Sequence, residues 1–308
     1  MKKEIPTITL NNGVLIPAIG NGPAGVGYSP KQTRQYSFPF IFFNRAYKKF
    51  IGRPIECFSY VNAVANSFKI GFTLLDNSAA YNNDIFIAKA IKKSGLKRED
   101  IFITTRVSNG AQRNKNVREE FFNILKKLNT DYVDLYQFHW PVTNYFLDTW
   151  KEMEKLYNEG YCRSIGVANC HVHHLEEIFK IAEVKPAVNQ IEIHPLFTQK
   201  ALIEYCKTKE IVVEAYTPIA RFDDRLVRLP ILKNIANKYN KSIAQIVLRW
   251  HIQNGIIPVV RSLNKNRQLE NISIFDFELT DEEMGQIDGI NINSRLRYDP
   301  DNCDFSIL

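Results

Sequence analysis

Short apolar runs alternate with longer amphipathic segments along most of the chain. Apolar runs of about four to eight residues are typical of buried strands, whereas apolar residues spaced three and four apart are typical of helices. We therefore predict strands at residues 16–20, 72–75, 101–105, 133–138, 164–168, 188–193, 211–215 and 256–260. Helices are predicted at residues 60–67, 85–91, 116–128, 145–158, 173–182, 198–207, 230–239, 243–253 and 264–271, with another that begins at 280. In the helix at 85–91, Ile85, Ala88 and Ile91 should form the buried stripe.

The order of these elements predicts one fold. Eight strands, most of them followed by a helix, are what an α/β protein of the (β/α)8 TIM barrel type requires. No internal repeat or Pro/Ser-rich linker divides the chain, so residues 1–308 should form a single domain. Ahead of the barrel, residues 7–10 and 14–16 flank Asn11-Asn12-Gly13, which predicts an N-terminal β-hairpin that acts as a lid or plug.

Two stretches near the N-terminus do not follow the barrel pattern. Residues 20–25 match G-x-G-x-x-G, but Tyr28-Ser29-Pro30 interrupts the helix that a dinucleotide-binding fingerprint needs. Residues 28–58 mix Tyr, Phe, Lys and Arg without a period and predict an insertion in a long first βα loop. This insertion either packs its own aromatic side chains against the barrel or forms a lid or partner-binding surface. We expect it to shape substrate access and to be dispensable for cofactor binding.

Composition and charge limit the function without naming it. The 45% hydrophobic content of 308 residues is enough for a large core, and the net charge of +7 is spread over the chain without a long basic run. No nucleic-acid-binding module is visible, so we expect no nucleic-acid partner. Five cysteines without C-x-x-C spacing argue against a disulfide framework or a zinc site. The chain lacks a signal-peptide pattern and a membrane span, which predicts a cytoplasmic protein. We also expect it to be a monomer.

Polar side chains gather where the predicted strands end. The strand-end residues are Asp76, Arg106, His139, Asn169, Gln190, Glu192, His194, Tyr216 and Arg261, and Tyr81 follows Asp76 in the next loop. In a barrel all these positions converge on one rim. Each residue taken alone could be structural, but together they offer a proton donor (Tyr81 or His139), charges that modulate it, amides and a stacking ring. This combination fits hydride transfer to a carbonyl from a bound cofactor.

The chain resembles the aldo-keto reductases almost from end to end. The resemblance rests on several blocks in family order: LNNGVLIPAIGNG (10–22), D-x-x-x-x-Y (76–81), HWP (139–141), DTWKEMEKLYNEG (148–160), SIGVANC (164–170), NQIEIHP (189–195), AYTPIA (215–220) and IPVVRSLNKNRQLEN (257–271). It implies NADPH-dependent reduction of a small-molecule aldehyde or ketone.

The resemblance also implies a role for each residue at the reacting end. Tyr81 would be the general acid, His139 would orient the carbonyl oxygen, and Asp76 would hold the cation that lowers the pKa of the tyrosine. Asn169 and Gln190 would bind the nicotinamide carboxamide, and Tyr216 would stack on its ring.

At the other end of the cofactor, the implied ligands follow the last strand. Arg261, Ser262 and Arg267 would hold the 2′-phosphate of NADPH, with Glu270 and Asn271 at the adenine. Two arginines suit this place because a guanidinium matches the geometry of a phosphate.

The chain departs from the family pattern at three places. Arg106 stands where the family has its catalytic lysine, and a bidentate pair with Asp76 would turn its charge away from Tyr81. Ala168 replaces a serine near the carboxamide, and the span from Gly22 to Asp76 is about twice the expected length. Arg106 and the insertion support an alternative: a barrel that binds NADPH with weak or no turnover and acts as a redox-sensing or interaction protein.

Overall fold

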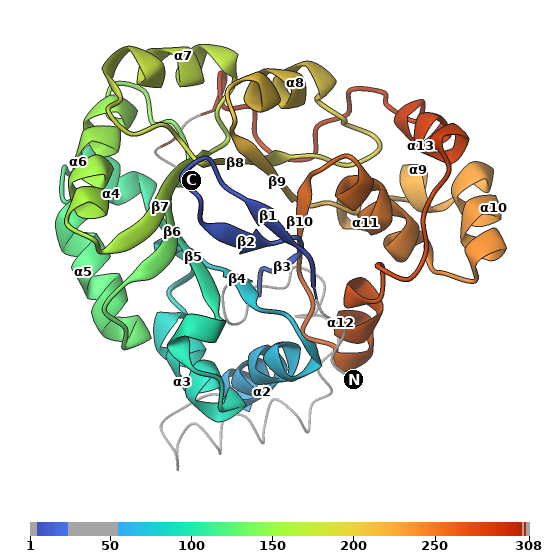
Figure 1. Cartoon of the computed structure of the whole chain (residues 1–308), viewed down its shortest axis with the longest axis horizontal. Helices are drawn as coiled ribbons and strands as arrows, with labels where there is room; N and C mark the ends of the chain where they lie inside the picture. The colour runs from blue at the N-terminus through green and yellow to red at the C-terminus, as the bar shows by residue number, and fades with distance from the viewer. Residues whose placement is uncertain (1–4, 24–54, 304, 306–308) are drawn as a thin grey trace, which may run out of the picture.

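The computed structural model describes residues 5–23, 55–303 and 305, and within them eight parallel strands close a barrel (Figure 1). The barrel order is β10-β3-β4-β5-β6-β7-β8-β9, as a TIM barrel requires. The strands are β3 (Gly20–Asn21), β4 (Leu74–Asp76), β5 (Phe102–Val107), β6 (Val133–Phe138), β7 (Cys162–Ala168), β8 (Val188–Glu192), β9 (Val212–Tyr216) and β10 (Ile257–Val260). The predicted fold is therefore confirmed.

Helices cover the outside of the barrel as a ring. They are α2 (Ile55–Ile70), α3 (Asp84–Ser94), α4 (Asn109–Arg113), α5 (Val117–Leu128), α6 (Phe146–Asn158), α7 (Val172–Ile181), α8 (Lys200–Thr208), α9 (Asp224–Val227), α10 (Pro230–Tyr239), α11 (Ile243–Gln253), α12 (Lys265–Ile272) and α13 (Asp281–Asp288). Short 3-10 turns occur at η2 (Ala79–Tyr81), η3 (Arg98–Asp100) and η4 (Ala220–Phe222). No helix in the described ranges is both long and apolar enough to cross a membrane.

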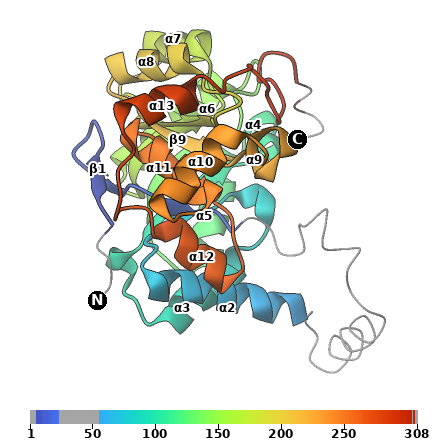
Figure 2. The ribbon, with the colours of Figure 1, turned by 90° about the vertical axis from the view of Figure 1, so that its right-hand side faces the viewer.

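The predicted hairpin is present and closes one end of the barrel. Strand β1 (Thr7–Thr9) pairs antiparallel with β2 (Leu15–Pro17). Leu10 and Ile16 pack in one buried cluster with Leu74 and Phe102 from the barrel strands, so the hairpin is a plug. Figure 2 shows β1 at one edge of the barrel.

The first barrel strand is shorter and later than predicted. Ile16 belongs to the hairpin, and only Gly20 and Asn21 pair with β4 and β10. A Cβ atom on Gly20 would lie 2.9 Å from Leu74 Cδ2, and one on Gly22 would lie 2.9 Å from Val259 Cγ1. The described glycines of the G-x-G-x-x-G match thus permit close packing of the barrel.

Two further predictions concern the buried face of α3 and the insertion at 28–58. In α3 the buried residues include Ile87 and Ala90, and Ile91 packs against the same core, while Ile85 is 51% exposed, so the predicted stripe was wrong at Ile85. Asp84, the first residue of α3, is buried as well, and its carboxylate accepts a hydrogen bond from Asn77 Nδ2 at 2.7 Å. The predicted insertion at 28–58 lies outside the described residues except for its last four, which are the first residues of α2.

Candidate active site

A buried polar network fills the barrel at the carboxyl ends of its strands. Arg106, on β5, is 1% exposed and forms an ion pair through Nη2 with Asp76 Oδ1 on β4. Gln190 Nε2, on β8, donates to Asp76 Oδ1 at 3.0 Å and to Glu214 Oε2 on β9 at 2.9 Å. Gln190 therefore links two buried acids, and Asp76 is the one that pairs with the buried cation.

The guanidinium of Arg106 is not held in the bidentate pair that the sequence suggested. While Nη2 contacts Asp76, Nη1 donates to the backbone oxygen of Asn77 at 2.9 Å. Its Nε atom has no hydrogen-bond partner among the described residues. Because the next carbonyl of the chain takes the second nitrogen, Asp76 accepts from one nitrogen only. Burial disfavours the charged guanidinium, but Asp76 and Tyr81 outweigh this and raise the pKa of Arg106.

Tyr81 ends the short turn η2, directly after β4. Ser78 caps this turn by accepting the N–H of Ala80 at 3.3 Å, and Asn82 leaves it in the left-handed conformation with φ of 48°. Burial raises the pKa of Tyr81, and the nearby Arg106 opposes this increase. The hydroxyl therefore carries its proton at neutral pH.

His139 follows β6 and faces the tyrosine. The two ring centroids are 6.1 Å apart with an interplanar angle of 89°, and Nδ1 of His139 lies 3.2 Å from Ser78 Oγ. Burial, Arg106 and Arg297 together lower the pKa of His139 to about 3. The imidazole is therefore neutral at physiological pH.

Asn169 is hydrogen-bonded to Tyr216, and both residues are predicted to contact a nicotinamide. Its backbone is in the left-handed region with φ of 60°, which asparagine tolerates better than most residues. Its Nδ2 donates to the backbone oxygen of His139 at 2.9 Å, and its Oδ1 accepts from the hydroxyl of Tyr216 at 2.7 Å. Gln190 lies deeper in the barrel, where Nε2 is engaged by Asp76 and Glu214.

The residues predicted to hold the far end of a cofactor surround the start of α12. Arg261 and Arg267 are exposed, and Ser262 is buried beside them at the end of β10. Asn264 caps the helix by accepting the N–H of Arg267 at 3.1 Å. A helix N-terminus with basic side chains is a favourable place for a phosphate group.

The two residues predicted to lie at the adenine are both on α12. The carboxylate of Glu270 accepts a hydrogen bond from Ser242 Oγ, at the start of α11, so one of its oxygens is engaged within the protein. Asn271 is 6% exposed.

Two acids have structural roles at this site that the sequence did not predict. Glu214 was not identified, and Glu192 was identified as a strand-end residue without a role. Glu214 was missed because it stands inside the strand pattern VVEAY and not at its end. Burial, together with the charge of Asp76, raises the pKa of Glu214 to about 7. Glu192, at the end of β8, accepts the backbone N–H groups of Leu296 at 2.6 Å and Arg297 at 3.0 Å. It thereby ties the C-terminal segment, residues 295–303, to the rim.

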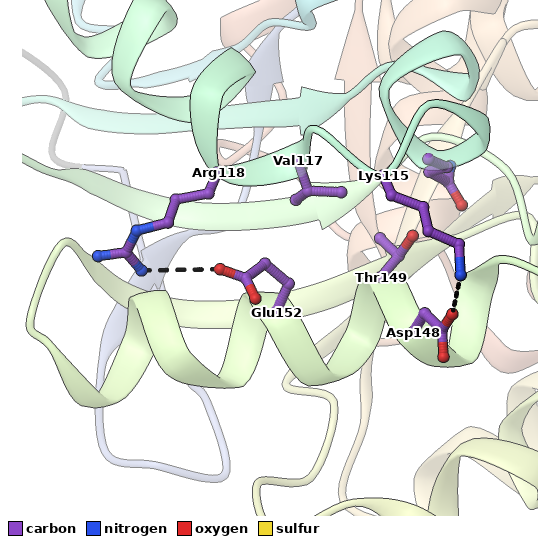
Figure 3. Close-up of a pocket in the computed structure, with 7 residues that line it drawn as sticks. Lys115, Val117, Arg118, Asp148, Thr149 and Glu152 are labelled. Atoms are coloured by element: carbon purple, nitrogen blue, oxygen red, sulfur yellow. Dashed lines mark hydrogen bonds and ion pairs between the residues drawn. The ribbon is translucent and has the colours of Figure 1, made fainter.

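A hollow on the outer surface lies away from this site. Figure 3 shows it between α5 and α6, crossed by the ion pairs Lys115–Asp148 at 3.1 Å and Arg118–Glu152 at 3.7 Å. Its lining residues belong to the helical layer and the loop before α5, and they exclude the candidate catalytic residues. We therefore assign no chemistry to it.

Comparison with known proteins identifies relatives over most of the chain. A model of the aldo/keto reductase family matches residues 53–292. The glyoxal reductase of Bacillus subtilis is 43% identical over 243 residues, which cover 79% of this chain and 87% of the relative. The methylglyoxal reductase DkgA of Escherichia coli is 37% identical over 243 residues, covering 78% and 88%. The crystal structure of an aldo-keto reductase from Bombyx mori in complex with NADP is 31% identical, with a TM-score of 0.81 and coverage of 97% and 96%.

Proposed function

Because the chain belongs to the aldo/keto reductase family, we propose that it is an NADPH-dependent oxidoreductase that reduces an aldehyde or ketone to an alcohol. The observation that supports this most is the grouping of Tyr81, His139, Asp76 and Arg106 at the carboxyl ends of neighbouring strands. Relatives named glyoxal and methylglyoxal reductases make small dicarbonyl compounds the first substrates to test.

The protonation states support Tyr81 as the general acid. Its raised pKa keeps the hydroxyl protonated, whereas the low pKa of about 3 leaves His139 neutral and without a spare proton to give. Bound NADPH would supply the hydride to the carbonyl carbon. Tyr81 would then protonate the oxygen, and His139 would orient that oxygen by a hydrogen bond. Arg106 would stabilise the phenolate that forms as the proton leaves.

The residues at the end of β10 and the start of α12 fit the cofactor. Arg261 and Arg267 offer guanidinium groups next to a helix N-terminus, where the 2′-phosphate of NADPH would be stabilised. Asn169 would use the remaining N–H of its amide, and Tyr216 its ring face, to hold the nicotinamide.

A matched pair of tyrosine variants tests the proposal. NADPH oxidation would be followed with methylglyoxal and with a reactive aromatic aldehyde, and NADPH binding by quenching of tryptophan fluorescence. Tyr81→Phe should lose almost all turnover while it still binds NADPH. Tyr205→Phe, on α8 outside the barrel, is the control and should keep the parent rate. Turnover in Tyr81→Phe equal to the parent rate would exclude Tyr81 as the acid.

Arg106 favours a second candidate function, an NADPH-binding barrel with weak or no turnover that acts in redox sensing or interaction. The arginine divides its donors between Asp76 and Asn77, and a less focused charge would stabilise a phenolate less well. Saturable NADPH binding without carbonyl-dependent oxidation, across a panel of aldehydes and ketones, would favour this reading.

A further inference from the structure

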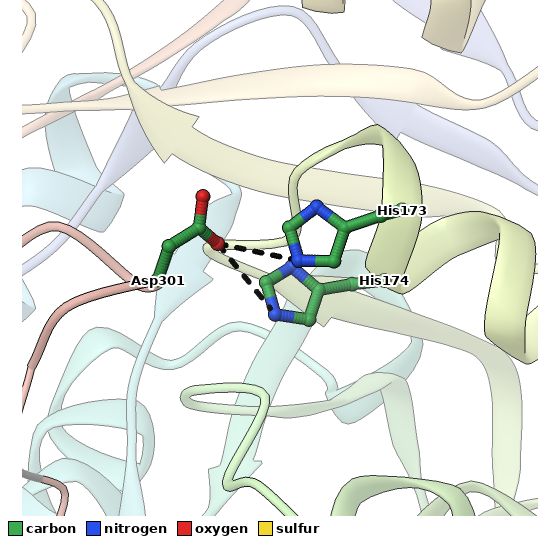
Figure 4. Close-up of side chains that lie close together, drawn as sticks. All are labelled: His173, His174 and Asp301. Carbon is green, nitrogen blue, oxygen red and sulfur yellow. Dashed lines mark ion pairs between the residues drawn. The ribbon is translucent and has the colours of Figure 1, made fainter.

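Three histidines at the start of α7 surround one aspartate of the C-terminal segment. His173 Nε2 lies 3.3 Å and His174 Nε2 3.9 Å from Asp301 Oδ1, and His171 Nδ1 lies 2.8 Å from Asp301 Oδ2. Figure 4 shows both imidazole rings of His173 and His174 directed at the same carboxylate oxygen. The ligand atoms of His173, His174 and Asp301 all lie within 4.8 Å of one another.

Contacts around the cluster hold its carboxylate in place. Arg295 Nη2 lies 3.2 Å from His171 Nε2. Since arginine can only donate, Nε2 accepts, and the remaining proton of a neutral His171 is on Nδ1, which faces Asp301 Oδ2. His171 thus occupies one carboxylate oxygen and leaves Oδ1 directed at the other two imidazoles. A hydrogen-bonded carboxylate and an oriented histidine are the usual surroundings of a metal site.

We propose that His173 Nε2, His174 Nε2 and Asp301 Oδ1 form a binding site for a divalent transition-metal ion of the zinc class. Bonds of about 2.0–2.2 Å in a tetrahedral site place neighbouring ligand atoms about 3.3–3.5 Å apart. The 3.3 Å and 3.9 Å separations match this spacing with small side-chain movements. Imidazole and carboxylate are ligands that zinc accepts, and water would complete the coordination.

One contact limits the affinity of the site. His174 Nδ1 accepts the backbone N–H of His171 at 3.2 Å, which places the proton of the neutral ring on Nε2. The ion must displace this proton, which moves to Nδ1 at the expense of the backbone contact. Because the ring is neutral before and after this shift, the cost is the lost backbone contact, and binding should be weaker than that of a structural zinc finger.

Because the site lies between α7 and the C-terminal segment, a bound ion would affect the rim of the barrel. His173 and His174 follow closely after Asn169, and Asp301 follows the segment that Glu192 holds at Leu296 and Arg297. An ion shared between α7 and Asp301 would fasten the C-terminal segment beside the candidate active site.

Cobalt provides a direct test, because four-coordinate Co2+ has visible absorption bands. The full chain should bind one Co2+ that Zn2+ displaces, and Asp301→Asn and His173→Gln should each abolish saturable binding. His171→Gln should weaken binding by about 10- to 100-fold, as loss of an orienting partner does. Asp224→Asn, an exposed aspartate paired with Arg228 away from histidine, is the control and should bind like the parent.

The same samples test the fastening effect, and a Cys303→Ser variant tests whether the thiol two residues after Asp301 binds the metal instead. Zn2+ should slow tryptic cleavage after Arg295 and Arg297 in the parent and leave the rate unchanged in Asp301→Asn. Cys303→Ser should bind metal like the parent. The proposal is overturned if the parent binds no stoichiometric Co2+ or Zn2+, if binding survives in both Asp301→Asn and His173→Gln, or if Cys303→Ser alone abolishes it. Equal cleavage with and without Zn2+ in a metal-loaded parent would refute the fastening effect.

Discussion

Replacing Arg106 by lysine should make the protein a faster but less stable enzyme. The arginine is buried and uses Nη2 for Asp76 and Nη1 for the carbonyl of Asn77, so its charge is spread over two contacts. A lysine ammonium is a compact charge that can approach the hydroxyl of Tyr81 more closely. One unit of lower tyrosine pKa corresponds to about 1.4 kcal/mol, so we expect kcat to rise by up to about tenfold.

The same substitution should lower the free energy of unfolding. Lysine has one nitrogen, so the 2.9 Å bond to Asn77 is lost while the pair with Asp76 is kept. A hydrogen bond from a charged donor contributes about 1.5–3 kcal/mol. Arg106→Met is the harsher comparison because it leaves Asp76 and Glu214 without their cation, at a cost of about 3–5 kcal/mol and most of the activity.

The assay is single-turnover oxidation of NADPH with a reactive aromatic aldehyde, run on the parent, Arg106→Lys, Arg106→Met and Tyr81→Phe. NADPH affinity and urea unfolding are measured on each variant, so that loss of fold is separated from loss of chemistry. If Arg106→Lys is slower than the parent, arginine supports Tyr81 better than lysine does, and a compact charge does not increase kcat in this site. If NADPH binds to all four proteins and none turns over, the non-catalytic function is favoured.

Three further predictions concern the cofactor, the C-terminal segment and pH. Arg267→Ala should weaken NADPH binding by about tenfold or more and NADH binding little, since it removes one charge-assisted contact; equal losses for both cofactors would contradict the 2′-phosphate assignment. Glu192→Gln should raise the carbonyl KM and leave the NADPH KM unchanged, because it weakens the contacts of Glu192 to Leu296, Arg297 and the buried His194. The raised pKa of Glu214 means that unfolding releases its proton, so stability should fall between about pH 5 and 8, and Glu214→Gln should flatten this fall in urea titrations.

The elements that the sequence predicted well are those whose burial is regular. Every residue of β6 and β10 is buried, and apolar residues predominate in both strands, so the pattern that predicts them is also the pattern of their burial. Strand β3 has two residues, too few for a pattern, and its glycines are explained only by their approach to Leu74 and Val259. The buried face of α3 includes Asp84, whose hydrogen bond to Asn77 joins the helix to the loop before it and therefore does not follow from a helical period.

The candidate site was predictable to the same extent. Topology alone brings strand-end residues to one rim, so their proximity followed from the strand count. The hydrogen-bond partners of each side chain did not follow from the strand count. Local spacing cannot show that Arg106 divides its donors or that Gln190 links two acids, since the contacts join separate strands. The histidine cluster depends on Asp301, which lies 130 residues after His171 in the chain.

The network inside the barrel also couples the pKa of Tyr81, the proposed proton donor, to acids elsewhere in the network. Asp76 and Glu214 compete for the charge of Arg106, and Arg106 in turn opposes the rise in the pKa of Tyr81. When Glu214 is protonated, Asp76 is the main negative charge that acts on Arg106, and when Glu214 ionises, a second negative charge acts on the guanidinium. Because the raised pKa of Glu214 places this change near neutral pH, the pH dependence of kcat should report Glu214 as well as Tyr81. A pH profile of kcat that is identical in the parent and in Glu214→Gln would show that the acids act independently.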